Sequence, residues 1–545
     1  MNLKPFFSIL LAGASLTAVA QSHLEGVEYY NADQLENARE LLTRNYNNAA
    51  TDKAIANYYL GQIALDNKNI KEAATYFQKG IDANPDYGFN YAGLGAVALR
   101  NGNAKEAESF FKEGESKAKK DASYNIAVAR AYYDVDPALY SNEIEKRVAK
   151  ARKTNLKDPS IYLFEGDMKK DHDDVGGAAA LYEMAATYNP TSAEAYVKYA
   201  NLFNRVNPGF AITKLKELLS QNPKSALGQK ELANAYYNNN DFANAAAEYG
   251  KYVNNPNHFK QDEDRYSFLL FYGQDYQKGY DYATALLAET PGNFTAQRFQ
   301  YMNAAQIPAM KDKLPQMAAA LYKNHKADPQ NNKLAAIDYT LIAEEYSGAD
   351  DHNTAIEVLN EAIKVMPENA NFDKQLAMTY VDLTQLTNAA KAYRGYINKT
   401  AEPSFNDYNQ QATFCYYAGV ENKKDNPAVA EEFFKEAEQN INKALEMAPE
   451  SYKGRKILGD IAMQRATDEK GVRTAAKPFY EEAIVYLEKS DDPSRYASDA
   501  KTMYNYLGNY YLDQKDVVKA KENFNKYLIY DPNNADYRKF VENLK

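Results

Sequence analysis

One spacing of small, aromatic and proline residues recurs four times along the 545-residue sequence. Two small residues lie 12 positions apart, a large apolar residue follows after 4, a further residue after 3, and a proline after 5 more. Four copies of a five-position pattern indicate a tandem structural repeat rather than one compact core. The copies are Gly61, Ala73, Phe77, Gly80 and Pro85; Gly166, Ala178, Tyr182, Ala185 and Pro190; Ala343, Ala355, Leu359, Ala362 and Pro367; and Gly508, Ala520, Phe524, Tyr527 and Pro532.

Each position of this pattern has a role in a pair of antiparallel helices. Small residues such as Gly61 and Ala73 let the two helices approach closely, and Phe77, one helical turn after Ala73, fills the space between repeats. Pro85 ends the second helix because it lacks a backbone N–H and restricts the residue before it. The structural anchors that we predict are Gly61, Ala73, Phe77, Pro85, Gly166, Ala178, Tyr182, Gly508, Ala520, Phe524 and Pro532.

Weaker copies of the pattern begin at Gly95, Ala233 and Ala377, and Gly61 and Gly95 lie 34 residues apart. In this period and in its anchor residues the sequence resembles the tetratricopeptide-repeat (TPR) family, as an exported bacterial member. The resemblance implies an all-α solenoid of roughly 13 or 14 helix-turn-helix repeats, in which stacking buries the apolar face that no single repeat can bury. A capping helix is expected from residue 535 to the C-terminus.

The regularity of the repeat divides the chain into segments. Residues 21–257 form an N-terminal array, residues 258–331 are helical but irregular, and residues 332–545 form a C-terminal array that includes the capping helix. Insertions interrupt the C-terminal array near residues 422–429 and at residues 467–477. We expect a specific partner to be recognised at such departures from regularity, because the regular anchors serve packing.

Residues 1–20 are interpreted as a signal peptide. Lys4 precedes a largely apolar stretch that ends at Val19, and Ala18 and Ala20 form a small-x-small cleavage site. We therefore expect secretion across the inner membrane and a location in the periplasm or at the outer membrane. No later segment reaches the roughly 20 apolar residues that a membrane-spanning helix needs.

Charge and motif content exclude several functional classes. With 64 basic and 74 acidic residues the net charge is −10, which argues against binding to nucleic acid. The five histidines have no metal-ligand spacing and no glycine-rich phosphate loop is present, so we predict no enzyme activity, no metal and no cofactor. The acidic turns at residues 171–174 and 350–352 are interpreted as solvated turns whose aspartates cap the next helix. The single cysteine, Cys415, is interpreted as a small buried thiol.

One local resemblance points to a ligand. Residues 230–249 read KELANAYYNNNDFANAAAEY and are similar to the first repeat of carboxylate-clamp TPR domains, which hold chaperone C-terminal tails. The resemblance implies that Lys230 and Asn234, one helical turn apart, contact a carboxylate. The sequence departs from that family's pattern in the next repeat, where Leu269 or Leu270 replaces an asparagine, so the full clamp is absent.

Three further polar or aromatic residues are binding candidates. Tyr237 belongs to a tyrosine pair on the same helix, and tyrosine offers a rigid contact surface with a hydroxyl tip. Asn505 and Asn509 form a polar pair in the last repeat, with the same spacing as Lys230 and Asn234.

Three functional hypotheses follow. The first is a protein-binding scaffold or adaptor in the periplasm or at the outer membrane, serving outer-membrane protein assembly, secretion or envelope maintenance. The second is glycan or cell-wall binding through the tyrosine-rich surface of residues 258–300. The third is an enzyme domain within residues 258–331, which the lack of a strand pattern, a histidine pair or a nucleophile motif disfavours.

Overall fold

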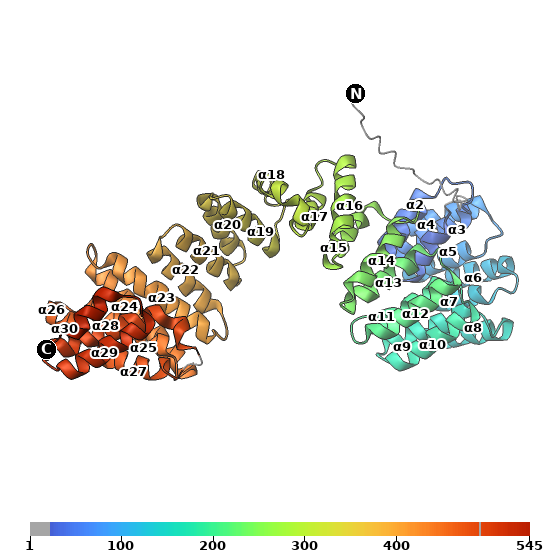
Figure 1. Cartoon of the computed structure of the whole chain (residues 1–545). Coiled ribbons are helices and arrows are strands. Elements are labelled where there is room, and N and C mark those ends of the chain that lie inside the picture. Colours follow the sequence, from blue (N-terminus) through green and yellow to red (C-terminus); the bar gives the residue numbers. More distant parts are fainter. Residues whose placement is uncertain (1–21, 490–491, 545) are drawn as a thin grey trace, which may run out of the picture. The chain divides into compact units, whose positions relative to one another are not determined.

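The computed structural model describes residues 22–489 and 492–544, and these residues form helices and connecting turns without a β-strand (Figure 1). The predicted signal peptide, residues 1–20, lies outside the described residues. The chain divides into two compact units, unit 1 up to Ile307 and unit 2 from Pro308 onward. This division falls inside residues 258–331, where the sequence repeat is least regular.

The described part of unit 1 contains eight antiparallel helical hairpins and one further helix, α17, which packs on α16. A 3-10 turn, η1 (Lys260–Asp262), precedes α15. The helices are α1 (Leu24–Asn31), α2 (Leu35–Arg44), α3 (Lys53–Asp66), α4 (Ile70–Ala83), α5 (Phe89–Arg100), α6 (Ala104–Ala118), α7 (Ala122–Tyr133), α8 (Ser141–Thr154), α9 (Pro159–Asp171), α10 (Val175–Tyr188), α11 (Ala193–Phe203), α12 (Pro208–Gln221), α13 (Ala226–Asn238), α14 (Phe242–Val253), α15 (Glu263–Tyr272), α16 (Tyr276–Glu289) and α17 (Phe294–Ala305).

The described part of unit 2 contains five hairpins between the lone helix α18 and the terminal helix α30. The 3-10 turns η2 (Pro308–Lys313) and η3 (Pro493–Tyr496) precede α18 and α28. The helices are α18 (Leu314–Ala327), α19 (Ala336–Gly348), α20 (His352–Val365), α21 (Ala370–Asp382), α22 (Leu386–Lys399), α23 (Phe405–Asn422), α24 (Pro427–Met447), α25 (Tyr452–Arg465), α26 (Glu469–Thr474), α27 (Lys477–Leu487), α28 (Ala497–Asp513), α29 (Val517–Tyr530) and α30 (Ala535–Asn543).

These hairpins confirm the all-α solenoid, with a number of repeats in the predicted range and a final helix where the cap was expected. The departures from regularity have simple structural forms. Around residues 422–429 the hairpin is lengthened, since α23 and α24 have 18 and 21 residues. Within residues 467–477 the short helix α26 is inserted between the two helices of a hairpin.

The repeat anchors lie where the two helices of a hairpin meet. The side chains of Ala73, Phe77, Ala178, Tyr182, Ala520 and Phe524 are fully buried. Gly61 and Gly508 are also buried, and a Cβ atom at Gly61 would overlap the Phe77 ring of the same hairpin. Pro85 and Pro532 lie in the exposed turns that follow α4 and α29. The spacing of the sequence pattern therefore corresponds to the contacts that close each hairpin.

The acidic turns are built into the hairpins. Asp173 and Asp350 adopt left-handed backbone conformations, with φ of 58° and 59°, seven positions after the small anchors Gly166 and Ala343. The residue that follows each of them caps the second helix of the hairpin: Asp174 accepts from the backbone N–H of Gly177, and Asp351 accepts from that of Thr354. The capping role predicted for these aspartates is confirmed.

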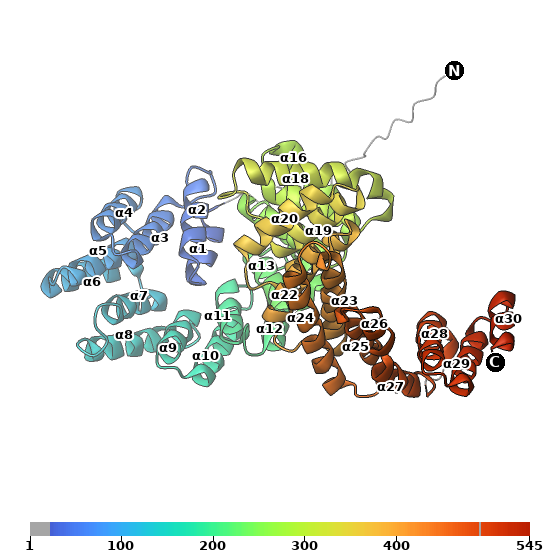
Figure 2. The same ribbon diagram turned by 90° about the vertical axis from the view of Figure 1, so that its left-hand side faces the viewer.

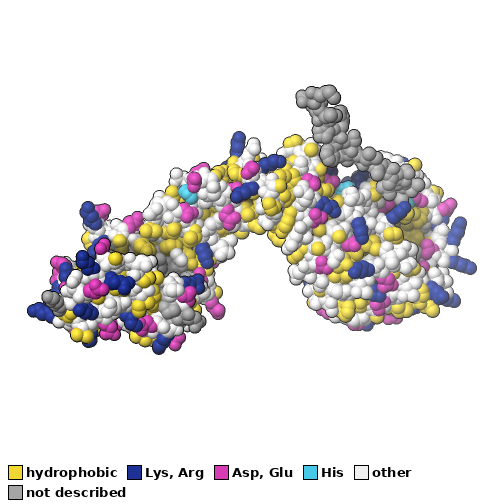
Figure 3. Space-filling view, in the orientation of Figure 1, with side chains coloured by type: hydrophobic (Ala, Val, Ile, Leu, Met, Phe, Trp, Pro, Cys, Tyr) yellow, Lys and Arg dark blue, Asp and Glu magenta, His cyan; other side chains and the backbone are white. Residues whose placement is uncertain are grey.

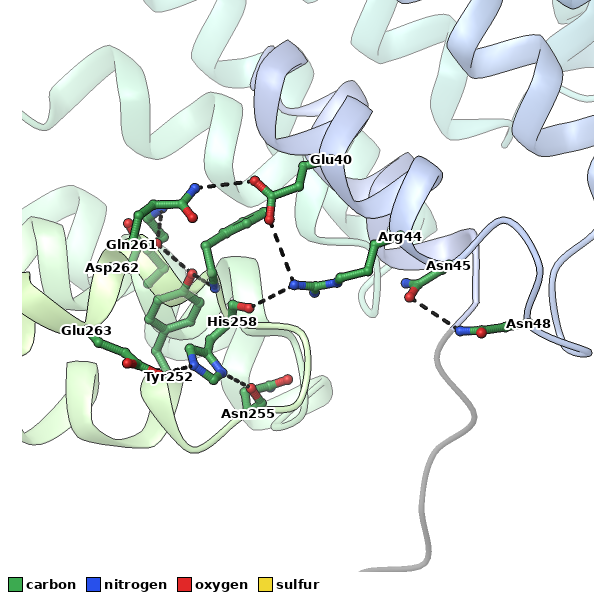
Figure 4. A network of polar contacts seen from close by, with 12 residues as sticks. Glu40, Arg44, Asn45, Asn48, Tyr252, Asn255, His258, Gln261, Asp262 and Glu263 are labelled. Carbon is green, nitrogen blue, oxygen red and sulfur yellow. Dashed lines mark hydrogen bonds and ion pairs between the residues drawn. The ribbon is translucent and has the colours of Figure 1, made fainter. Parts of the chain in front are cut away.

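The superhelix of unit 1 turns back on itself, so that α1 contacts α11 and α13 (Figures 1 and 2). Tyr29 of α1 packs edge-on against the buried ring of Phe259, with ring centroids 5.3 Å apart. Gln34 donates to Glu231 at 2.7 Å. Arg44 donates to the backbone carbonyl of His258 at 3.3 Å (Figure 4). The segment before α15 and the helix α13 thus join the seventh hairpin to the first, and we call this set of contacts the seam that closes unit 1.

Oppositely charged side chains are interspersed over the visible face of both units (Figure 3). Within the described residues, no helix has the length and apolar character that a membrane span requires. The predicted buried thiol is also found, since the Cys415 side chain is fully buried and its burial raises the pKa of the thiol well above the usual range.

Candidate binding groove

A groove of about 800 Å³ crosses three consecutive first helices of unit 1, α11, α13 and α15. Lys230, Asn234 and Tyr237 of α13 all line it, so three of the residues selected from the sequence share one surface. The groove is also lined by Asn201 of α11, Arg205 of the turn after α11, and Arg265 of α15. The sequence analysis selected none of these three residues.

Arg265 is the central cation of this groove. Its guanidinium carbon lies 4.9 Å from the centre of the Tyr237 ring, which places the planar group over the aromatic face. Arg265 Nη2 donates to Asn234 Oδ1 over a long 3.4 Å, and Arg265 Nε is buried without a hydrogen-bond partner. Among the described residues, no carboxylate forms an ion pair with this guanidinium. The groove therefore presents a half-buried positive charge that is stacked but not neutralised.

Lys230, in contrast, is already paired within the chain. Its ammonium donates to Asp262 Oδ2 at 2.6 Å. The hydroxyl of Tyr252 donates to the same oxygen, also at 2.6 Å (Figure 4). The ammonium also lies 5.3 Å from the centre of the Phe259 ring. The carboxylate that the clamp resemblance assigned to a ligand is thus supplied internally by η1, and the cations left without a carboxylate are Arg205 and Arg265.

Amide side chains alternate with these cations along the groove. Asn201 accepts a long hydrogen bond from Asn204 at 3.5 Å, and Asn234 accepts the one from Arg265. The Nδ2 groups of Asn201 and Asn234 make no hydrogen bond to any described residue, so they can donate to a ligand. Asn201 and Asn234 lie 33 residues apart, one repeat length, and that periodicity is the signal by which the sequence alone could have located this surface.

A second, smaller cavity of about 240 Å³ lies inside unit 1, where α1, α3, α7, α9 and α11 meet; we call it the axial chamber. Its cations are fully engaged. Lys198 is 5% exposed and donates to Asp33 at 3.0 Å and contacts Asp167 at 3.1 Å, and Arg130 donates to the other oxygen of Asp167 at 2.6 Å. The Tyr182 hydroxyl also donates to Asp167, at 2.9 Å. The turn after α1 is thereby tied to α9 and α11.

Three carboxylates of the axial chamber are desolvated, and of these Asp134 forms a long ion pair with Arg100 at 4.0 Å. Burial raises the pKa of Glu194 to about 7, although Lys198 opposes the shift. Burial likewise raises the pKa of Asp66 to about 6, with a further increase from Asp134, and burial raises the pKa of Asp134 itself. The chamber is therefore a charge network in which Asp66, Asp134 and Glu194 hold protons more tightly than they do in water.

The other sequence-selected residues are engaged in unit 2. Asn505 accepts from the Tyr537 hydroxyl of α30 at 2.7 Å, and Asn509 donates to the backbone carbonyl of Asn505 at 2.8 Å. The Asn505 side chain thus helps to attach the terminal helix.

In the tyrosine-rich segment 258–300, Tyr266 is buried and packs edge-on against Tyr282, with ring centroids 4.8 Å apart. These two rings contribute to hairpin packing.

The stacked hairpins and their shared anchor positions define an α-helical repeat protein. A tetratricopeptide-repeat family model matches residues 23–88 and 208–258, so these two segments carry tetratricopeptide repeats. The second matched segment ends within the seam that closes unit 1 and includes Lys230, Asn234 and Tyr237.

Solved TPR structures are similar at low identity. The C-terminal part of a TPR repeat-containing protein from Cytophaga hutchinsonii is 17% identical, with a TM-score of 0.38 over 51% of this chain and 98% of that one. YrrB, a TPR protein with an unusual peptide-binding site, is 15% identical, with a TM-score of 0.28 over 41% of this chain and 99% of its own. Cut9-Hcn1 of the APC/C is 13% identical, with a TM-score of 0.25 over 89% of each chain. Among curated proteins, none matches this sequence.

Proposed function

We propose that this chain is a non-enzymatic scaffold that binds an extended segment of a partner protein in the groove across α11, α13 and α15. The observation that carries the proposal is the convergence of Asn201, Arg205, Asn234, Tyr237 and Arg265 on one open surface, with donors that no described residue satisfies. Helix faces that line the inside of a TPR superhelix suit extended chains, because successive repeats present similar donors at regular intervals.

The location that we propose is outside the inner membrane. Lys4, the apolar stretch to Val19 and the small residues Ala18 and Ala20 support export, and the partner would then be a protein of the cell envelope. Outer-membrane protein assembly, secretion and envelope maintenance are the settings that fit such a scaffold, with attachment to the outer membrane through the partner.

A site-specific photo-crosslinker tests the groove. A benzophenone amino acid at Asn201, inside the groove, is expected to give a light-dependent adduct with a discrete partner peptide in intact cells. The same amino acid at Lys71, on the exposed surface of α4, is expected to give none. Equal adducts from both positions, or none from Asn201, would contradict the proposed binding surface.

Export is tested on the protein isolated from the cell of origin. We expect release by osmotic shock and an N-terminus close to Gln21. Recovery in the cytosolic fraction with residues 1–20 still attached would contradict export.

A further inference from the structure

The arginines of the groove differ from most charged side chains nearby in having no carboxylate partner among the described residues. Lys230 is paired with Asp262, and Glu231, the one carboxylate in the groove lining, accepts from Gln34. Arg205 is exposed and makes no hydrogen bond or ion pair within the described residues, and Arg265 reaches only an asparagine. Two uncompensated guanidinium groups therefore remain in a chain whose net charge is −10.

We infer that the partner segment is acidic and that side-chain carboxylates, spaced along an extended chain, bind Arg205 and Arg265. This inference rests on the proposed function and names the chemistry of its ligand. Guanidinium groups form short, charge-assisted and often bidentate hydrogen bonds with carboxylates, which neither a neutral amide nor an ammonium can replace.

The position of Arg265 favours such an anion. Its guanidinium is half-buried and stacked on Tyr237, so part of its hydration is lost before any ligand arrives. A carboxylate would gain more electrostatic interaction energy at Arg265 than at a fully hydrated arginine, because the effective dielectric constant around a half-buried group is lower. Stacking on the ring also fixes the plane of the donors, which reduces the entropy lost on binding.

The separation of the two arginines favours side-chain carboxylates over a chain terminus. Neighbouring helices pack about 9 Å apart, so two steps from α11 to α15 cover about 18 Å, which an extended segment spans with about six residues. A C-terminus supplies one carboxylate at one point, whereas two separated cations call for two acidic side chains. Between them, the free Nδ2 groups of Asn201 and Asn234 can donate to backbone carbonyls of the segment.

Fluorescence anisotropy with the full mature chain tests this inference. The first probe is a labelled nonapeptide with blocked ends and alternating Asp or Glu; the second is its Asn and Gln counterpart with blocked ends; the third is that neutral peptide with a free C-terminal carboxylate. We expect the acidic probe to bind at least about tenfold more tightly than either neutral probe.

Two matched double variants complete the test. R205Q/R265Q removes both groove cations and is expected to lower the affinity for the acidic probe to that of the neutral one. K71Q/K105Q removes the same charge from exposed positions on α4 and α6 and is expected to leave the affinity unchanged. Circular dichroism melting of each variant verifies the fold.

Several results would overturn the acidic-segment inference: equal or undetectable binding of all three probes, preference for the free C-terminus, or an acidic preference that survives R205Q/R265Q. Crosslinking of a partner through Asn201 together with any of these would leave the scaffold function standing and remove only the acidic ligand. Loss of the Asn201 adduct would instead contradict the scaffold function itself.

Discussion

The groove and the axial chamber are built from the same parts, the first helices of consecutive hairpins in unit 1, yet their charges are used differently. In the chamber, Lys198 and Arg130 both bind Asp167, and Lys198 also binds Asp33 of the first hairpin. In the groove, Arg205 and Arg265 have no carboxylate partner among the described residues. Both regions concentrate charge, so charge by itself does not mark a binding surface.

The two regions differ in whether their cations have carboxylate partners. A buried cation with two carboxylates is a structural tie, and its removal leaves uncompensated partners behind. A half-buried cation without a carboxylate carries a partly desolvated charge that stays unneutralised until an anionic ligand binds. Lys230 illustrates the difference within the groove itself, because Asp262 converts it from a candidate ligand contact into part of the seam that closes unit 1.

The largest expected effect is on stability, at the chamber. Asp167→Asn leaves Lys198 and Arg130 without their shared carboxylate, and we expect the free energy of unfolding of unit 1 to fall by about 3 kcal/mol. Urea unfolding followed by circular dichroism measures this change. Arg205→Gln in the groove serves as the control and is expected to alter stability by less than about 0.5 kcal/mol. Similar effects of the two substitutions would remove the distinction between the regions.

A smaller effect concerns pH. The pKa of Glu194 is raised to about 7 by burial, so the folded chain binds its proton more tightly than the unfolded chain does. The stability associated with this proton is complete at acidic pH, below the pKa of an unfolded glutamate, and is lost as the pH rises through about 7.

Glu194→Gln keeps the neutral form at every pH. We expect it to raise the unfolding free energy at pH 8 by about 1 to 2 kcal/mol and to have little effect near pH 4.5. Arg205→Gln should show no such pH dependence. A stabilisation by Glu194→Gln that is the same at both pH values would exclude protonation of the chamber as its cause.

The smallest expected effect is the response to salt. Between 50 and 300 mM NaCl we expect the affinity for the acidic probe to fall by about threefold to tenfold, since the groove cations are partly exposed and screening acts on them. The difference in unfolding free energy between the unsubstituted chain and Asp167→Asn should change little, because Asp167 and its partner Lys198 are both buried. Anisotropy and urea titrations at the two salt concentrations provide both values. An affinity independent of salt would contradict a charged ligand.

The sequence predicted the hairpins because their anchors act locally. Gly61, Ala73 and Phe77 meet within one hairpin, and a fixed spacing along the chain is enough to reveal them. Local spacing could not predict the seam that closes unit 1, because its partners are far apart in the sequence. Gln34 and Glu231 lie 197 positions apart, and Asn257 and Glu25 lie 232 positions apart. No periodicity within one repeat encodes such pairs.

The candidate site was predicted in part for the same reason. Asn234 and Tyr237 were found because α13 keeps the regular repeat. Arg265 was missed because it lies where the spacing degenerates. Lys230 was assigned to a ligand because its partner, Asp262, lies in η1, whose position against α13 depends on the tertiary closure of unit 1. Local pattern thus located the surface, and only the tertiary structure distinguished its free cations from its paired ones.

Hydrogen–deuterium exchange with and without the acidic nonapeptide tests most directly whether the uncompensated cations form the binding surface. We expect added protection in α11 near Asn201, in α13 from Lys230 to Asn238 and at the start of α15, with no change in α3, α7 and α9 around the chamber. Protection centred on the chamber helices, or none in α11, α13 and α15 at saturating peptide, would contradict it.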